Sequence, residues 1–250
     1  MFMEPYEEYA KICIETIEKI RNRERENILK AAEIMTKAIL DDKLIHVFGP
    51  THGRMGVDDM FFRAGGLVPI NPIYDESFSL SHALKASKAL LVQNYISGVL
   101  DYYKVSEGDV MIIIEYLGVK PVVIEAALES KHRGAKVIGI TSSEFSKSIP
   151  LDSPLRHPTR KNLHEVVDVF IDTYAPPGDA VLKIKNFKAK VAPISNISYT
   201  YIVNSLVAQV VKNLLEKGVE PPVWISMNVP GGPEHNQKYI EKYFNRIKHM

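Results

Sequence analysis

Long apolar runs, disulfide-forming cysteines and an excess of charge are all missing from this chain of 250 residues. Its one cysteine, Cys13, cannot form an intrachain disulfide, so we expect a protein of the reducing cytoplasm. No apolar stretch approaches the ~18 residues of a membrane span, and residues 1–5 lack the basic-then-apolar order of a signal peptide. The net charge of +1 argues against nucleic acids and membranes as partners.

Sequence motifs for nucleotides and metals are also missing. No segment matches the phosphate loop GxxxxGK[ST] or the dinucleotide fingerprint GxGxxG. The eight histidines show no metal-ligand spacing such as HExxH, which argues against a zinc site. We therefore expect neither a metal nor a bound cofactor.

Apolar residues are present in two patterns that alternate along the chain. Stripes at helical spacing, such as Tyr6, Tyr9, Cys13 and Ile17, predict helices, and short apolar runs between polar turns predict strands. The charged run 21–26 leaves open whether the first two helices are continuous. We expect helices over about 5–21, 28–40, 54–63, 121–132, 198–217 and from 234. We expect strands over 44–48, 67–70, 110–114 and 136–140, within 166–172, and at 223–226. Residues 71–84 should form a surface loop.

Strands that alternate with helices predict an α/β fold, with a parallel sheet that carries helices on both faces. No linker or internal repeat divides the sequence, so we expect a single domain over residues 1–250. It would include an N-terminal helical segment of about 1–41 and a C-terminal helix of about 234–248. Because ligands bind outside the carboxyl ends of such strands, the loops after residues 48, 114 and 140 are candidate binding loops, and the loop after residue 226 is a further candidate.

The first candidate loop is rich in small and hydrogen-bonding residues. Its glycines permit close backbone approach, a threonine offers a hydroxyl group, and an arginine offers a fork of N–H donors. This loop suits an anion at the start of a helix, although an ordinary turn between strand and helix has the same features. Its candidate ligand-binding residues are Gly49, Thr51, His52, Gly53 and Arg54.

The other two loops differ from each other in chemistry. The second contains Glu115 and Gly118, so an acid stands where an anion site favours hydroxyl groups. The third, Thr141, Ser142 and Ser143, has three hydroxyl groups that suit phosphate or sugar oxygens. The same hydroxyl groups also suit a plain helix cap, so both interpretations remain open.

Acid–base chemistry has candidates in two places. Asp58 and Asp59 follow the first loop by one helical turn and point to different sides of a helix, so only one would face a site. Glu234 and His235 follow the rigid loop 228–233, and histidine titrates near neutral pH. A solvated helix face and a simple first-turn cap are the alternatives for the two pairs.

Several stretches together resemble the sugar isomerase (SIS) domain superfamily, in particular a branch of uncharacterised proteins usually labelled phosphosugar isomerases. The resemblance implies a three-layer α-β-α sandwich with a five-stranded parallel sheet, and long N-terminal helices that pack against a partner subunit in a homodimer or higher homo-oligomer. It implies a sugar or sugar phosphate as ligand, with Asp59 and His235, together with Glu234, as acid and base. The matching stretches are 48–66 (FGPTHGRMGVDDMFFRAGG), 68–73, 108–110, 121–127, 137–142, 176–180 (PPGDA), 219–223, 228–232 and 234–236.

The chain also departs from that family pattern. In the second loop, a family sequence close to Ser-Asn-Ser-Gly is replaced by Glu115-Tyr116-Leu117-Gly118. The first loop is altered by Pro50-Thr51, and the family's Glu-Glu pair after it is replaced by Asp58-Asp59. Three functions follow as hypotheses. The first is a phosphosugar isomerase, and the second is a non-catalytic sensor of a sugar or sugar phosphate. The third is an enzyme for an unphosphorylated or cationic sugar selected by Glu115.

Overall fold

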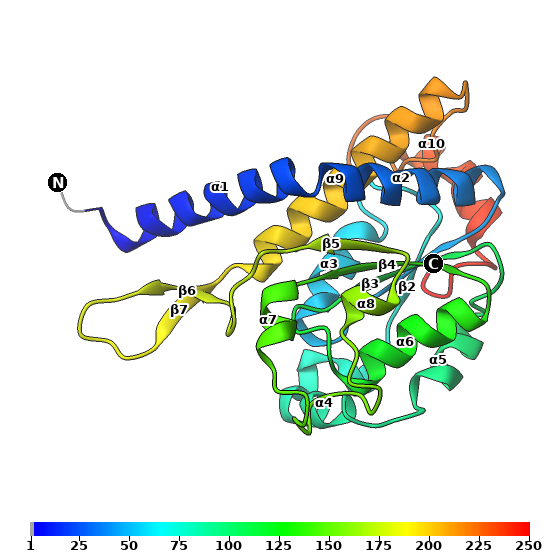
Figure 1. Cartoon of the computed structure of the whole chain (residues 1–250). Helices are drawn as coiled ribbons and strands as arrows, with labels where there is room; N and C mark the ends of the chain where they lie inside the picture. Colours follow the sequence, from blue (N-terminus) through cyan, green and yellow to red (C-terminus); the bar gives the residue numbers. More distant parts are fainter. Residues whose placement is uncertain (1–2) are drawn as a thin grey trace.

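The computed structural model describes residues 3–250 and contains a five-stranded parallel sheet (Figure 1). The strand order is β2-β1-β3-β4-β5, so the predicted α/β fold with a five-stranded parallel sheet is confirmed. The central strands are buried on both faces and are apolar except for His46 of β1, as is typical of parallel strands between helices. The strands are β1 (Ile45–Phe48), β2 (Ile70–Ile73), β3 (Val110–Ile114), β4 (Lys136–Thr141) and β5 (Val169–Asp172).

Helices cover both faces of this sheet and form separate cores with it. Alternate residues of β3 enter the two cores: Ile112 and Ile114 face one, and Met111 and Ile113 face the other. The first core is closed by α1 (Pro5–Arg23), α2 (Arg25–Leu40), α3 (Arg54–Met60) and α9 (Ser195–Glu216). The second is closed by α4 (Ala83–Ala89), α5 (Ile96–Tyr102), α6 (Pro121–His132) and α8 (Leu163–Val166).

Shorter elements complete the chain. The helix α7 (Ser143–Ser148) follows β4 directly, and α10 (Gly232–Tyr243) packs through Tyr239 and Tyr243 on a third small core around Trp224. Three short 3-10 turns span Thr51–Gly53, Glu76–Phe78 and Leu80–His82. Among residues 3–250, no helix is both long enough and apolar enough to cross a membrane.

The break between α1 and α2, which the sequence left open, lies at Glu24. This residue leaves helical geometry (φ −100°, ψ 10°) and is buried. Its carboxylate accepts hydrogen bonds from the Tyr174 hydroxyl group at 2.6 Å and from the Asn27 side chain at 2.8 Å. The two helices are therefore separate and are fixed at their junction by a buried acid.

Several predicted boundaries were wrong. The second strand covers Ile70–Ile73 rather than 67–70, so the expected surface loop over 71–84 begins inside the sheet. Pro72 is tolerated there because β2 is an edge strand. Helix α3 ends at Met60 because Phe61 is already extended (φ −95°, ψ 133°). Helix α10 spans 232–243 rather than 234–248. The strand expected at 223–226 is only an isolated bridge between Val223 and Leu67.

An antiparallel hairpin was not predicted. Its strands are β6 (Ala180–Lys183) and β7 (Lys190–Pro193). Figure 1 shows the hairpin projecting from the body of the protein beside the first half of α1. The Tyr9 hydroxyl group donates a hydrogen bond to the Pro193 carbonyl oxygen at 2.6 Å and so ties the two together.

Candidate functional site

The three loops predicted from the sequence meet at the carboxyl edge of the sheet. A Cβ atom added to Gly53 of the first loop would lie 2.0 Å from the Ile114 carbonyl oxygen, which precedes the second loop. A Cβ atom on Gly118 would lie 2.6 Å from the Thr141 hydroxyl oxygen of the third loop, and Gly118 has a φ of +63°. Both positions therefore require glycine, and the loops contact one another through them.

The first loop is ordered around an arginine held by acids. Thr51 is buried, with a φ of +50°, while His52 is exposed. The Arg54 guanidinium group lies 4.4 Å from the centre of the Tyr74 ring, 3.7 Å from the Asp58 carboxylate and 3.6 Å from the Glu76 carboxylate. Arg54 is therefore a positioned cation at this edge, with acidic partners already beside it.

The second loop is closed by its own acid. Glu115 is 1% exposed, and one of its carboxylate oxygens accepts the Gly118 N–H at 2.5 Å. The other oxygen lies 3.6 Å from the Lys120 ammonium group and has no hydrogen-bond partner among residues 3–250. Burial, and then the Glu115 carboxylate, raise the pKa of Tyr116 to about 12. The backbone N–H that would serve an anion here is already used by Glu115.

The third loop uses most of its hydroxyl groups inside the protein. Ser142 caps α7 by accepting the Phe145 N–H at 3.1 Å, and its hydroxyl group donates to the Ala175 carbonyl oxygen at 2.6 Å. The Ser143 hydroxyl group donates to the Asp172 carboxylate at 2.5 Å. The Thr141 hydroxyl group is buried and has no partner among the described residues. Ser142 is therefore a helix cap, whereas the Thr141 hydroxyl group makes no hydrogen bond within the described residues.

Two further residues belong to this edge and were not identified from the sequence. Lys120 faces Glu115, as described above. Tyr199 of α9 is fully buried, and its hydroxyl group has no hydrogen-bond partner among the described residues. Burial, and then the nearby carboxylates of Glu115 and Asp179, raise the pKa of Tyr199 well above its usual value. Tyr199 lies within the apolar stripe of a long helix, so nothing in the sequence distinguished it from an ordinary core residue.

The expected acid and base are not brought together within one chain. Asp59 accepts a hydrogen bond from the Asn204 side chain at 2.7 Å and pairs with Arg63. His235 lies 3.3 Å from the Val223 carbonyl oxygen, and Glu234 is exposed in the first turn of α10. Across residues 3–250, no hydrogen bond or ion pair joins Asp59 to either of them.

A pocket of about 200 Å³ lies between the regions of Asp59 and His235. Arg63, the partner of Asp59, is on one side, and Asn236, next to His235, is on the other. Both Asn236 side-chain atoms already bond to the backbone of Ile225. None of the predicted acid–base residues lines this pocket directly. The residues that line it are Phe62, Arg63, Ala64, Trp224, Ile225, Ser226, Met227, Asn228 and Asn236.

Comparison with known proteins gives relatives of the same length and the same fold. The SIS domain family matches residues 8–142. A UPF0309 protein of Caldanaerobacter subterraneus subsp. tengcongensis is 36% identical over 246 residues, which cover 97% of this chain and 98% of that protein.

Two solved structures share the fold. A phosphoheptose isomerase from Francisella tularensis has a TM-score of 0.54 at 14% identity and covers 84% of this chain and 100% of its own. A phosphoheptose isomerase from Neisseria gonorrhoeae has a TM-score of 0.52 at 15% identity and covers 83% of this chain and 95% of its own. The family match over residues 8–142 agrees with the parallel sheet described above, and this chain belongs to the SIS domain family.

Proposed function

We propose that this protein binds a sugar phosphate at the carboxyl edge of its parallel sheet and interconverts its aldose and ketose forms. The observation that carries the proposal is a group of buried polar atoms without partners where the loops meet: Glu115 Oε1, the Thr141 hydroxyl group and the Tyr199 hydroxyl group. A buried polar atom left unpaired costs free energy, and a sugar hydroxyl group both donates and accepts hydrogen bonds. The structural neighbours include phosphoheptose isomerases, so phosphosugars are the first substrate class to test.

In this proposal the first loop holds the phosphate. Arg54 supplies a positioned guanidinium group there, and the turn through Gly49, Thr51 and Gly53 lies beside it. The second loop is a poor alternative, because two like charges ~4 Å apart at an effective dielectric constant of ~20 repel by about 4 kcal/mol. The Glu115 carboxylate would oppose a phosphate in that way, although Lys120 offsets part of the repulsion. Glu115, Gly118 and Thr141 then contact the sugar, and Ser142 and Ser143 shape the third loop.

Isomerisation requires a proton to leave the carbon next to the carbonyl group and to return to the neighbouring carbon of the resulting enediol. We assign the base role to Asp59, and the role of acid on the sugar oxygens to His235 with Glu234. Asp59 is positioned by Asn204 and Arg63. Because His235 is separated from Asp59 in one chain, this assignment requires His235 to reach the site from a second subunit or after a movement of α10.

The closed second loop favours a second candidate function. A buried carboxylate oxygen without a partner, as on Glu115, suits an ammonium or hydroxyl group better than a phosphate. In this case the chain acts on an unphosphorylated or amino sugar at the same edge. The two candidates differ in whether the phosphate of the ligand contributes to binding.

The test is a thermal-shift screen of matched pairs, each sugar phosphate beside its free sugar, followed by an isomerase assay. A ligand at ~100 times its dissociation constant adds about 2.7 kcal/mol of stability, which is easily seen as a raised melting temperature. We expect stabilisation by phosphosugars only, lost in Thr141→Val and retained in Ser148→Ala, which removes an exposed hydroxyl group at the end of α7. Asp59→Asn should abolish turnover and spare binding.

Each other outcome changes the proposal in a defined way. Stabilisation by free or amino sugars alone would establish the second candidate. Phosphosugar binding without turnover of any bound sugar would make the protein a sensor. Unchanged turnover in Asp59→Asn would remove this residue from the mechanism, and no stabilisation by any sugar would overturn the binding site itself.

A further inference from the structure

A groove lined by tyrosines lies between the carboxyl end of β2 and helix α5, which belongs to the face of the sheet opposite α1 and α9 (Figure 1). Its volume of about 510 Å³ is within the ~300–1,000 Å³ of pockets that bind small molecules. The ligand-binding residues predicted from the sequence all lie outside it. We call it the tyrosine groove, and it is lined by Tyr74, Asp75, Glu76, Tyr95, Gly98, Val99, Tyr102 and Tyr103.

The charge of the tyrosine groove is negative. Among the described residues that line it, Asp75 and Glu76 are the only charged ones. The half-buried Asp75 carboxylate accepts the Ser77 N–H at 2.7 Å and the Tyr95 hydroxyl group at 2.9 Å, and it forms no ion pair within residues 3–250. Glu76 is exposed and lies 3.6 Å from the Arg54 guanidinium group. A cation in the groove would therefore meet negative charge that the groove itself does not balance.

The tyrosine rings around the groove already contact two cations of the protein. The Arg54 guanidinium group lies 4.4 Å from the centre of the Tyr74 ring, and the Lys248 ammonium group lies 4.5 Å from the centre of the Tyr102 ring. Such cations are attracted by the negative face of an aromatic ring. In the described part of the chain, neither Arg54 nor Lys248 is among the residues that line the groove. The groove therefore offers aromatic walls and acids without a cation of its own.

A glycine on helix α5 keeps the groove open. Gly98 lies inside this helix, where glycine is destabilising relative to alanine. An added Cβ atom would meet nothing within 4 Å, so no close packing contact requires a glycine at this position. Tyr95 and Tyr102 lie three residues before and four residues after Gly98 and therefore flank it on one face of the helix. A larger side chain at position 98 would project between these two tyrosines and into the groove.

The hydrogen-bonding groups of the walls are largely in use. The Tyr95 hydroxyl group donates to Asp75. The Tyr103 hydroxyl group donates to the Tyr74 carbonyl oxygen and accepts the Tyr74 N–H, both at 2.8 Å. What remains is negative charge and aromatic surface, which suit a cation that carries methyl groups instead of N–H donors. We propose that the tyrosine groove binds a small quaternary ammonium compound, with tyrosine rings around its methyl groups and with Asp75 and Glu76 as counter-charges.

Charge and hydrogen bonding distinguish this ligand from other small molecules. An anion such as a sugar phosphate would be repelled by the two acids of the groove. A neutral sugar would need free hydrogen-bonding groups, and a primary ammonium group has three N–H donors to satisfy. The proposal is independent of sugar binding at the three loops, because Glu115, Thr141 and Tyr199 all lie outside the groove.

The test is isothermal titration calorimetry at neutral pH with three probes. Choline carries a quaternary ammonium group, 3,3-dimethyl-1-butanol has the same shape with an uncharged carbon in place of the nitrogen, and ethylammonium carries three N–H donors. We expect the wild type to bind choline more tightly than the neutral analogue, by about tenfold or more, because only the charged probe is attracted by the ring faces and the acids. Ethylammonium should bind more weakly than choline.

A substitution that fills the groove tests where the probe binds. Gly98→Leu should abolish choline binding without disturbing a packed contact, because the space at this position is open. The matched control is Ser87→Leu, at an exposed position of helix α4 outside the groove, and it should bind choline as the wild type does. Circular dichroism checks that both variants are folded.

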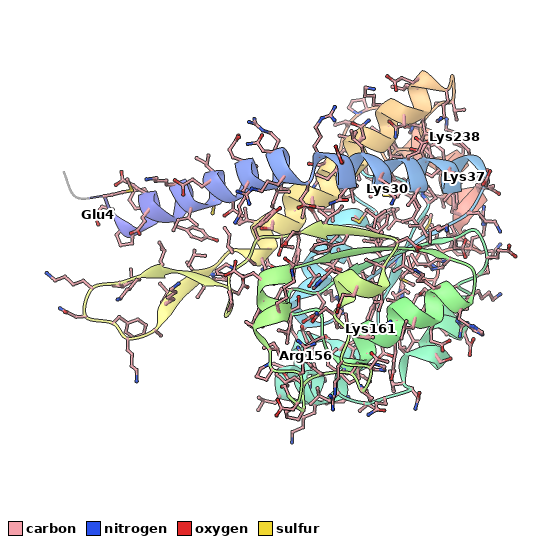
Figure 2. All side chains as sticks on the ribbon, in the orientation of Figure 1. Glu4, Lys30, Lys37, Arg156, Lys161 and Lys238 are labelled. Carbon is pink, nitrogen blue, oxygen red and sulfur yellow. The ribbon has the colours of Figure 1, made fainter. Side chains whose placement is uncertain are left out.

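A substitution that removes one charge tests the role of the acids. Asp75→Asn keeps a side-chain oxygen for the Ser77 N–H and removes the negative charge, so we expect the affinity for choline to fall by about fivefold or more. Glu8→Gln is the control and should leave the affinity unchanged. Glu8 is an exposed acid one helical turn from Glu4, which Figure 2 shows at the far end of α1, clear of the body.

Equal affinity for choline and the neutral analogue would overturn the inference, and so would the absence of choline binding. Unchanged affinity in Gly98→Leu or Asp75→Asn would place the bound choline outside the groove and overturn it as well. Tighter binding of ethylammonium than of choline would identify a primary amine as the ligand instead. A wild type that binds choline but no sugar would support this inference while overturning the proposed function, and the converse result would do the reverse.

Discussion

Gly53 has the tightest backbone contact at the carboxyl edge of the sheet. Its Cβ position lies 2.0 Å from the Ile114 carbonyl oxygen, and backbone cannot move aside as a flexible side chain can. We therefore expect Gly53→Ala to separate the first loop from β3 and to lower the free energy of unfolding by about 1–3 kcal/mol. Gly98→Ala is the control: Gly98 is in α5 with no atom near its Cβ position, so alanine should be neutral or stabilise by up to about 1 kcal/mol. Urea denaturation measures both, and equal effects would contradict the argument.

At the same scale, sequence reasoning located the candidate loops but not the use of their side chains. The position of Thr141, Ser142 and Ser143 after a strand was evident from the sequence. Whether each hydroxyl group faces a ligand or caps a helix depends on distant partners, such as Ala175 for Ser142 and Asp172 for Ser143. The direction of Glu115 was likewise unpredictable, because it is set by the turn at Gly118 and by Lys120.

At the scale of the elements, the hydrogen bond at the junction of α1 and α2 can be tested for its contribution to stability. The Tyr174 hydroxyl group donates to Glu24, and burial, followed by this hydrogen bond, raises the pKa of Tyr174. Tyr174→Phe leaves a buried carboxylate oxygen without that donor, so we expect a loss of about 1–3 kcal/mol in the free energy of unfolding. Tyr6→Phe, at an exposed tyrosine, should change stability little. Chemical denaturation at neutral pH compares them, and similar losses in both variants would show that Glu24 does not depend on Tyr174.

Elements with strong periodicity were predictable, and irregular ones were not. Helix α6 and strands β3 and β4 lie within one residue of their predicted ranges, because apolar period and flanking turns agree there. Strand β2 was misplaced because Pro72 argues against a strand unless the strand is at a sheet edge, which the sequence does not show. The hairpin did leave a signal, since apolar residues and lysines alternate on both sides of Asn186, whose φ of +64° makes the turn.

For the molecule as a whole, a buried polar chain links the sheet to the C-terminal segment. Asp109 lies 3.3 Å from His46, the other His46 nitrogen lies 3.2 Å from the Asn71 amide group, and Asn71 accepts the Lys248 N–H at 3.3 Å. Burial acts to raise the pKa of Asp109, but its bonds to His46 and to the Leu44 and Ser106 backbone outweigh burial and lower the pKa overall. Ionised Asp109 therefore stabilises the fold above its unfolded pKa of about 4, and this stability is lost as the pH falls through the lower folded pKa.

Asp109→Asn should show this acid dependence directly. We expect the variant to be less stable than the wild type at neutral pH by about 1.5–3 kcal/mol, as for hydrogen bonds to charged groups. The difference should shrink as the pH falls below about 4. Unfolding curves across this range test the expectation, with Asp152→Asn as a control at an exposed acid. A difference that stays constant with pH would exclude Asp109 as the source of acid sensitivity.

The packing of α2 on α9 has a consequence for the synthesis of the protein. Helix α2 contacts α9 more extensively than any other described element, yet the two lie at opposite ends of the chain. At a translation rate of about 5–20 residues per second, α2 leaves the ribosome roughly 10–40 s before α9 is complete. During that interval the apolar face with Ala32 and Met35 lacks the cover that α9 provides. The core around α2 is therefore completed only when the last fifth of the protein has been made.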